Sequence, residues 1–288
     1  MTFNDFIKQA WNDHADKTEE VAAKLMEAGS VIELNDQIPR LAQLITHVFG
    51  EHLGQWEKGI QLLQELKSIP EFEAASESGP AIDRSIAALS LASGEKTSVD
   101  EFSKSDQVRV LATAAAALNE RNDPKNADKW FRAALSKAQN GLDKADPANR
   151  ALAVTANNLA CSLEDKPSRT EIDTEFMILT AQTARKYWEI AGSWLEVERA
   201  EYRLSQTYLK AENFAKSLEH AKKSLEIAKA NTAPPLEFFF GYEALALAEK
   251  ALGNVLGFEK AVENVKAYFE KLESDDKPWC EPSLKKLI

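Results

Sequence analysis

The sequence predicts an all-α protein made of consecutive antiparallel helices. Its 288 residues contain only 11 glycines and 10 prolines, and alanine, leucine, glutamate and lysine, which favour helix, dominate the rest. Apolar residues recur at spacings of three and four, the period of one helix face, and no convincing alternation typical of strands occurs. This composition excludes collagen-like, disordered and disulfide-scaffold classes. The length allows either two domains or one elongated repeat array.

Helix boundaries are marked by capping residues and breakers. A carboxylate followed by proline predicts a helix start, because the carboxylate caps free N–H groups and proline suits the first helical position. A serine with glutamate three residues later has the form of a capping box. Such marks occur at Asp123-Pro124, Asp146-Pro147, Ser193 with Glu196, Asn213, Thr232 to Pro235, and Gly253-Asn254.

The first 93 residues predict a less regular helical region. Its opening segment is amphipathic and predicts one or two capping helices, and a degenerate helix pair follows. One further helix has no evident partner. The predicted helices lie within residues 1–29, 36–49, 54–66 and 80–92, with polar breaks at 71–79 and 94–105.

One order of residue types recurs along the later part of the chain. In the first helix, leucine and a small residue are followed one turn later by an aromatic residue. After a tight loop, the second helix carries an aromatic residue and then small residues at helical spacing, as from Leu204 to Leu225. The recurrence predicts stacked copies of one helix pair. Equivalent first-helix positions are Ala114, Leu159, Leu204 and Ala248, which gives steps of 45, 45 and 44.

This order resembles a tetratricopeptide repeat, although the standard unit has about 34 residues and these units are longer. The Asn-Asn-Leu-Ala run at residues 157–160 is similar to first helices of kinesin-light-chain-like arrays. The resemblance implies a right-handed superhelix of antiparallel helix pairs. It covers residues 104–273, after an N-terminal helical region (1–93) and before a C-terminal tail (274–288).

Charge and hydropathy restrict the partners and the compartment. The 46 acidic and 35 basic residues give a net charge of −11, which repels phosphate backbones and makes nucleic acid an unsuitable partner. The sequence shows no signal peptide and no apolar run of about 18 residues that would suggest a membrane span. Cys161 and Cys280 are expected to be free thiols. We therefore expect a cytoplasmic protein.

Catalytic and metal-binding motifs are not recognisable in the sequence. It contains no Gly-rich phosphate loop, no Gly-x-Ser-x-Gly and no His-Glu-x-x-His. The four histidines are scattered, and His47 and His52 are five residues apart, whereas ligands on one α-helical face usually sit at i and i+4. We therefore expect no metal site and no cofactor, and a protein that is not an enzyme.

Two aromatic features near the C-terminus predict contacts between elements. Phe238, Phe239 and Phe240 are consecutive, and three consecutive helical residues point in three directions. At least one of them must face a neighbouring element or a partner. Trp279, in a proline-flanked segment, is available to dock on the last helix pair.

The resemblance implies that the first helices line a concave groove and that their non-packing residues contact a ligand. Asparagine amides can pair with a peptide backbone, and arginine suits a carboxylate. Arg199, Arg203 and Lys210 stripe one helix face, although nearby glutamates offer them ion pairs instead. The candidate contacts are Arg109, Asn119, Asn157, Asn158, Arg199, Tyr202, Arg203, Gln206 and Lys210.

The expected function is a non-catalytic scaffold that binds a peptide or protein segment, with a preference for a carboxylate-bearing one. Two alternatives stay open: a peptide-sensing regulator whose N-terminal bundle binds an effector, and an enzyme with an active site between helices. If the protein is such a scaffold, Arg203→Ala or Asn158→Ala should weaken partner binding and leave the midpoint of thermal unfolding almost unchanged.

Overall fold

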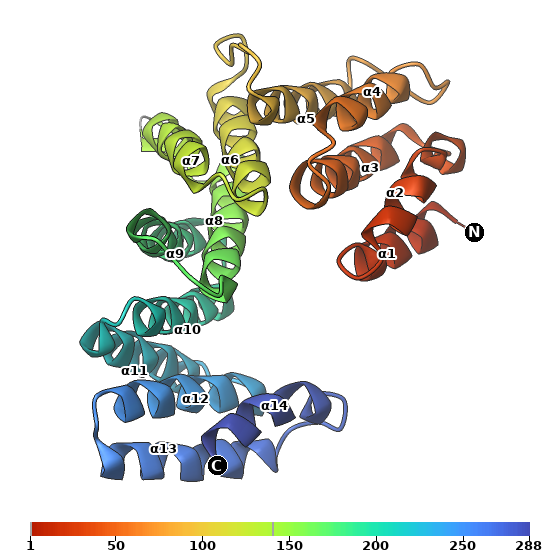
Figure 1. Ribbon diagram of the computed structural model, residues 1–288. Coiled ribbons are helices and arrows are strands. Elements are labelled where there is room, and N and C mark those ends of the chain that lie inside the picture. The colour runs from red at the N-terminus through yellow and green to blue at the C-terminus, as the bar shows by residue number, and fades with distance from the viewer. Residues whose placement is uncertain (1, 140) are drawn as a thin grey trace. The chain divides into compact units, whose positions relative to one another are not determined.

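The computed structural model describes residues 2–139 and 141–288, and in these residues all regular structure is helical (Figure 1). This confirms the all-α prediction. The chain divides into two compact units, Met1–Asp143 and Lys144–Ile288, so the predicted repeat region from 104 to 273 is described in two parts. Within both described segments, no helix is long and apolar enough to cross a membrane.

The N-terminal unit contains the irregular region and one regular helix pair. Helices α4, α5 and α6 each pack on the next helix along the chain. A core of large apolar side chains, including Phe3, Ile38, Phe49 and Ile82, joins the first five helices. The helices are α1 (Phe3–Asp13), α2 (Thr18–Leu25), α3 (Ile38–Ile45), α4 (Trp56–Leu66), α5 (Ser78–Ser93), α6 (Lys104–Glu120) and α7 (Pro124–Gln139), with short 3-10 turns at Ala28–Val31 and Asn35–Gln37.

Helix α3 continues directly into a π-helix, η3 (Thr46–His52). The backbone N–H of Leu53 donates to the carbonyl of Val48 at 3.0 Å, the five-residue spacing that defines a π-helix. Residues five apart therefore lie nearly above one another, and the Nε2 atoms of His47 and His52 are 3.1 Å apart. The expectation that these two histidines face different directions was wrong, because it assumed α-helical geometry.

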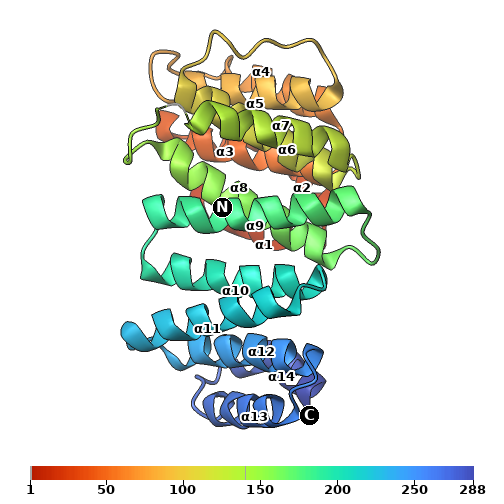
Figure 2. The same cartoon turned by 90° about the vertical axis from the view of Figure 1, so that its left-hand side faces the viewer.

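The C-terminal unit is a succession of antiparallel helix pairs (Figures 1 and 2). Helices α8 and α9, α10 and α11, and α12 and α13 form the pairs, and α9 and α11 pack against the helix that follows each of them. The residues after 273 form a last helix that packs on α12 and α13. The bounds are α8 (Pro147–Asp165), α9 (Glu171–Ala191), α10 (Trp194–Lys210), α11 (Phe214–Ala230), α12 (Pro235–Ala251), α13 (Val255–Phe269) and α14 (Lys277–Leu287).

The predicted capping marks are confirmed. Helices α7 and α8 begin at Pro124 and Pro147, and the side chain of Asp146 accepts a hydrogen bond from the N–H of Ala148 at 2.8 Å. Asn213 and Asn254 cap α11 and α13 by accepting from the backbone N–H of the third residue of each helix. These contacts are local, so the sequence is sufficient to specify them.

The capping box at the start of α10 gives a stability prediction. Ser193 Oγ accepts from the N–H of Leu195 at 3.2 Å, and the N–H of Ser193 donates to Glu196 Oε2 at 2.7 Å. Ser193→Ala removes one of these partners, and we expect a loss of about 1 kcal/mol in the free energy of unfolding. Urea denaturation followed by circular dichroism measures this loss. An unchanged stability would show that the box does not hold α10.

The three consecutive phenylalanines of α12 point to three different neighbours, as predicted. Phe239 is fully buried in the core of this end of the chain. Phe238 stacks on Tyr268 of α13 with ring centroids 4.8 Å apart. Phe240 lies 4.8 Å from the ring of Trp279. Trp279 thus docks on the last helix pair as expected, although it remains 64% exposed.

Candidate functional site

The first helices of the three pairs in the C-terminal unit form a continuous row, because α10 packs on both α8 and α12. Mostly polar side chains, with one phenylalanine, follow a stripe along each of these helices, at the spacings of three and four that share a helix face. The stripes comprise Asn157, Cys161 and Glu164 on α8; Arg199, Tyr202, Arg203, Gln206 and Lys210 on α10; and Glu237, Phe240 and Glu243 on α12. We call this set the α8–α10–α12 face.

An ion pair joins α10 to α8 on this face. Arg203 Nη1 donates to Glu164 Oε2 at 2.5 Å, and Thr207 Oγ1 donates to the other carboxylate oxygen at 2.5 Å. Glu164 is buried. Its burial raises the pKa of the carboxyl group, while the Arg203 guanidinium and the Thr207 hydroxyl oppose that rise. Arg203 is therefore a structural partner of a buried carboxylate.

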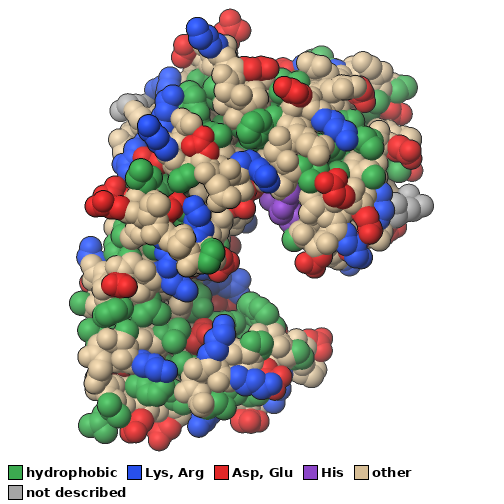
Figure 3. Space-filling model, viewed as in Figure 1, with side chains coloured by type: hydrophobic (Ala, Val, Ile, Leu, Met, Phe, Trp, Pro, Cys, Tyr) green, Lys and Arg blue, Asp and Glu red, His purple; other side chains and the backbone are tan. Residues whose placement is uncertain are grey.

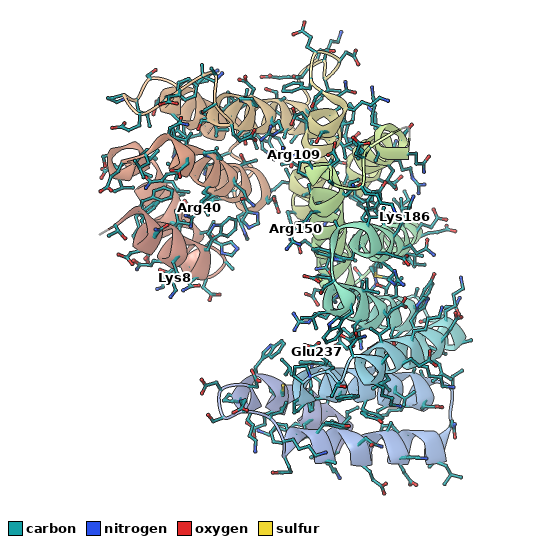
Figure 4. The ribbon with its side chains drawn as sticks, turned by 180° about the vertical axis from the view of Figure 1, so that it is seen from behind. Lys8, Arg40, Arg109, Arg150, Lys186 and Glu237 are labelled. Carbon is teal, nitrogen blue, oxygen red and sulfur yellow. The ribbon has the colours of Figure 1, made fainter. Side chains whose placement is uncertain are left out.

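A second ion pair joins α10 to α12. Arg199 donates through Nε and Nη2 to the two oxygens of Glu237, at 3.1 and 2.5 Å. Glu237 is buried at the start of α12 (Figure 4), whereas the Arg199 side chain remains 57% exposed. Arg199 therefore holds Glu237 and still presents guanidinium N–H groups to solvent.

Glu198 lies beside this second pair, buried between helices. Its Oε1 accepts from Ser224 Oγ of α11 at 2.6 Å. Burial raises the pKa of Glu198 to about 8, and the negative charge of Glu237 adds to the rise. The carboxyl group therefore carries a proton at neutral pH.

A tyrosine–glutamate contact completes the links between α10 and α12. The Tyr202 hydroxyl donates to Glu243 Oε2 at 3.1 Å, and the Tyr202 ring meets Phe240 edge to face at 5.8 Å. Burial, with the nearby Glu243 carboxylate, raises the pKa of Tyr202 well above its ordinary value. Tyr202 stays protonated and serves as a hydrogen-bond donor inside the protein.

Gln206 and Lys210 continue the stripe toward the end of α10. The amide nitrogen of Gln206 and the Nε atom of Arg203 are buried and have no hydrogen-bond partner among the described residues. Lys210 is exposed in the last turn of the helix. This end of α10 therefore carries hydrogen-bond donors that the described side chains leave unsatisfied.

The two predicted asparagines of α8 lie at the edge of the same face. Asn158 is exposed, and Asn157 is partly buried with its amide nitrogen 3.3 Å from Asn158 Oδ1 and 3.8 Å from Cys161 Sγ. Burial raises the pKa of the Cys161 thiol, so it stays protonated. The Asn158 amide is thus the group on α8 best placed to contact a ligand.

The other two predicted residues, Arg109 and Asn119, lie on α6 in the N-terminal unit (Figure 4). Arg109 Nη1 pairs with Asp106 of its own helix at 3.5 Å. Asn119 is 4% exposed and lies within the packing of that unit. These two residues are therefore not part of the α8–α10–α12 face.

The face is completed by three carboxylates that were not predicted from the sequence: Glu164, Glu237 and Glu243. All three are buried, and each pairs with a residue on a neighbouring helix. A glutamate inside an otherwise apolar helix requires a partner, because an unpaired buried charge is costly. Glu243, between Tyr242 and Ala244 in such a helix, carries that signal in the sequence.

The exposed groups on this face and at its edge are two cations, on Arg199 and Lys210, and the amide of Asn158. Such groups recognise polar ligands through hydrogen bonds and charge. No protein-family model matches this sequence, and no curated protein matches it.

Proposed function

We propose that the protein is a non-catalytic scaffold that binds an extended segment of a partner protein on the α8–α10–α12 face. One observation carries the proposal: three first helices lie in a continuous row, and hydrogen-bond donors on Asn158, Arg199 and Lys210 are exposed along it. Stacked helix pairs generally offer extended surfaces of this kind. A peptide backbone supplies the acceptors that these donors need.

We propose in addition that a carboxylate of the partner engages Arg199. The guanidinium already pairs with Glu237, but its exposure lets a second carboxylate approach. A peptide carboxylate would then compete with Glu237 for the bidentate site. Arg203 takes no such part in the proposal, because Glu164 holds it inside the protein.

Peptides selected from a random library on the immobilised full-length protein test the proposal. We expect Asn158→Ala to weaken their binding about tenfold, since the amide contributes hydrogen bonds of roughly 1.4 kcal/mol in total. Isothermal titration calorimetry measures the affinity. Because Asn158 is exposed, the variant should melt as the parent does.

Lys222→Ala is the matched control, because Lys222 is exposed on α11, outside the row of first helices. The control should bind the selected peptides with parental affinity. Glu237→Gln should strengthen the binding of peptides with a free terminal carboxylate and leave amidated versions unaffected. Equal binding by the Asn158 and Lys222 variants would contradict the assignment of this face.

We assign the helix pairs to a tetratricopeptide-like, right-handed array acting in the cytoplasm. The recurrence at 45, 45 and 44 residues and the successive pairing of helices support the repeat assignment. Free Cys161 and Cys280 support a reducing compartment.

A further inference from the structure

Three histidines converge in the N-terminal unit, from two different elements. His14 follows α1, and His47 and His52 belong to the π-helix. One ring nitrogen from each lies within 4.8 Å of the other two, and the three side chains are partly buried. Histidine atoms gather at the surface of this unit in Figure 3, so an ion can reach them from solvent.

Two of the rings are oriented by hydrogen bonds on the nitrogen away from the cluster. His47 Nδ1 lies 3.0 Å from Glu51 Oε1, and His14 Nδ1 lies 2.5 Å from the carbonyl oxygen of Trp11. A proton on each Nδ1 leaves the Nε2 lone pair free. Carboxylate and carbonyl acceptors behind histidine ligands are the usual arrangement at metal sites in proteins, where they fix the tautomer and raise ligand basicity.

The backbone that carries the rings is held from several sides. Arg121, directly after α6, donates to the carbonyl of His52 at 2.7 Å, which anchors the end of the π-helix. Arg40 of α3 (Figure 4) donates to Asn4 of α1 at 2.8 Å and lies over the Phe3 ring. The cluster is therefore built on packed helices.

The spacing of the nitrogens suits a small divalent transition-metal ion. A tetrahedral zinc ion with Zn–N bonds of about 2.0–2.1 Å holds its ligand nitrogens about 3.4 Å apart. The His47–His52 separation of 3.1 Å is close to this value, and a ring nitrogen of His14 lies within 4.8 Å of both.

We propose that His14, His47 and His52 bind a zinc-type divalent ion, with a fourth coordination position left for water. Three protein ligands with one open position are a common zinc arrangement, and imidazole nitrogen is a preferred ligand. The ion clamps the end of α1 to the π-helix. Glu51 acts as a positioning residue for His47 and does not touch the ion.

The alternative is a metal-free cluster in which one Nε2–H hydrogen-bonds to the other Nε2 and the rings pack on Trp11. The ring of His47 lies 5.1 Å from that of Trp11, in keeping with such packing. The two possibilities differ in what happens when metal is added. A metal-free cluster has no reason to take up an ion stoichiometrically.

The test uses the whole chain, which is stripped with a chelator, incubated with zinc and dialysed. We expect one zinc per chain by mass spectrometry of the metal content, and a visible absorption band of four-coordinate Co²⁺ when cobalt is added instead. Zinc at about 100 times its Kd should raise the Tm of the N-terminal unit by about 7 °C. No bound metal, no cobalt band and an unchanged Tm would overturn the proposal.

Variants assign the ligands. His14→Gln should weaken zinc binding by more than about 100-fold, and Glu51→Gln by about 10- to 100-fold. His220→Gln is the matched control, because His220 lies in the C-terminal unit beside Glu201, and it should bind zinc as the parent does. Circular dichroism confirms that each variant is folded. If His14→Gln and His220→Gln lowered zinc affinity equally, the assignment would be wrong.

Discussion

Replacing Arg203 with methionine is expected to destabilise the C-terminal unit by about 3 kcal/mol. Arg203 is the cationic partner of Glu164, which is buried between α8 and α10 and accepts a second hydrogen bond from Thr207. Removing one member of a buried ion pair leaves an uncompensated charge, which costs about 3–5 kcal/mol. Methionine keeps much of the side-chain volume, so the loss reports the charge and not a cavity. Urea denaturation followed by circular dichroism measures it.

A double variant separates the ion pair from the rest of the site. Arg203→Met combined with Glu164→Gln removes both charges and keeps an acceptor for Thr207, so most of the stability should return. Lys223→Ala is the control, because its ion pair with Glu219 lies on the surface of α11 and should leave the midpoint unchanged. A single Arg203 variant as stable as the parent would show that Glu164 does not need this partner.

The sequence alone led to the opposite expectation for Arg203, namely a change in binding without a change in melting. Arg203 lies on a helix face with Arg199 and Lys210, and the repeat resemblance implied that this face lines a ligand-binding groove. Its partner Glu164 is 39 residues away along the chain, and nothing in either local sequence pairs them. Contacts between neighbouring helices of a row depend on packing that the local pattern does not encode.

Local features were predicted well, because their partners lie within a few residues. The capping box of Ser193 and the Asp146 cap form within one helical turn, and the sequence specifies both partners. The divergence of the three phenylalanines at 238–240 follows from helical geometry alone. Which helix each ring meets, by contrast, depends on the stacking of α10, α13 and α14.

The π-helix is the element that the sequence predicted least well. The wider turn of a π-helix leaves no signature in the amino-acid composition. The apolar spacing from Ile38 to Val48 still suits an α-helix. The one available signal was the His47–His52 spacing, which is unfavourable in an α-helix and favourable in a π-helix. π-Helical turns occur frequently at functional sites, which gives the histidine cluster added interest.

Glu198→Gln is expected to stabilise the protein at pH 8.5 by about 2 kcal/mol and to leave it unchanged at pH 4.5. The pKa of Glu198 is about 8 in the folded protein and about 4.5 in an unfolded chain. Between these values the folded state holds a proton that the unfolded state has released. Stability therefore falls as the pH rises through this window, and the loss is complete above the folded pKa.

Glutamine reproduces the protonated carboxyl at every pH: its oxygen still accepts from Ser224, and its NH₂ group can donate to Glu237. We expect a gain below the full linkage value of about 1.4 kcal/mol per pKa unit. Thermal melts of parent and variant at the two pH values measure the difference, about 5 °C at pH 8.5. The control is Glu226→Gln, the same change at an exposed position of α11, which should behave alike at both pH values. If Glu198→Gln stabilised the protein equally at pH 4.5 and pH 8.5, the gain would come from packing, and the buried carboxyl would not be the group that titrates.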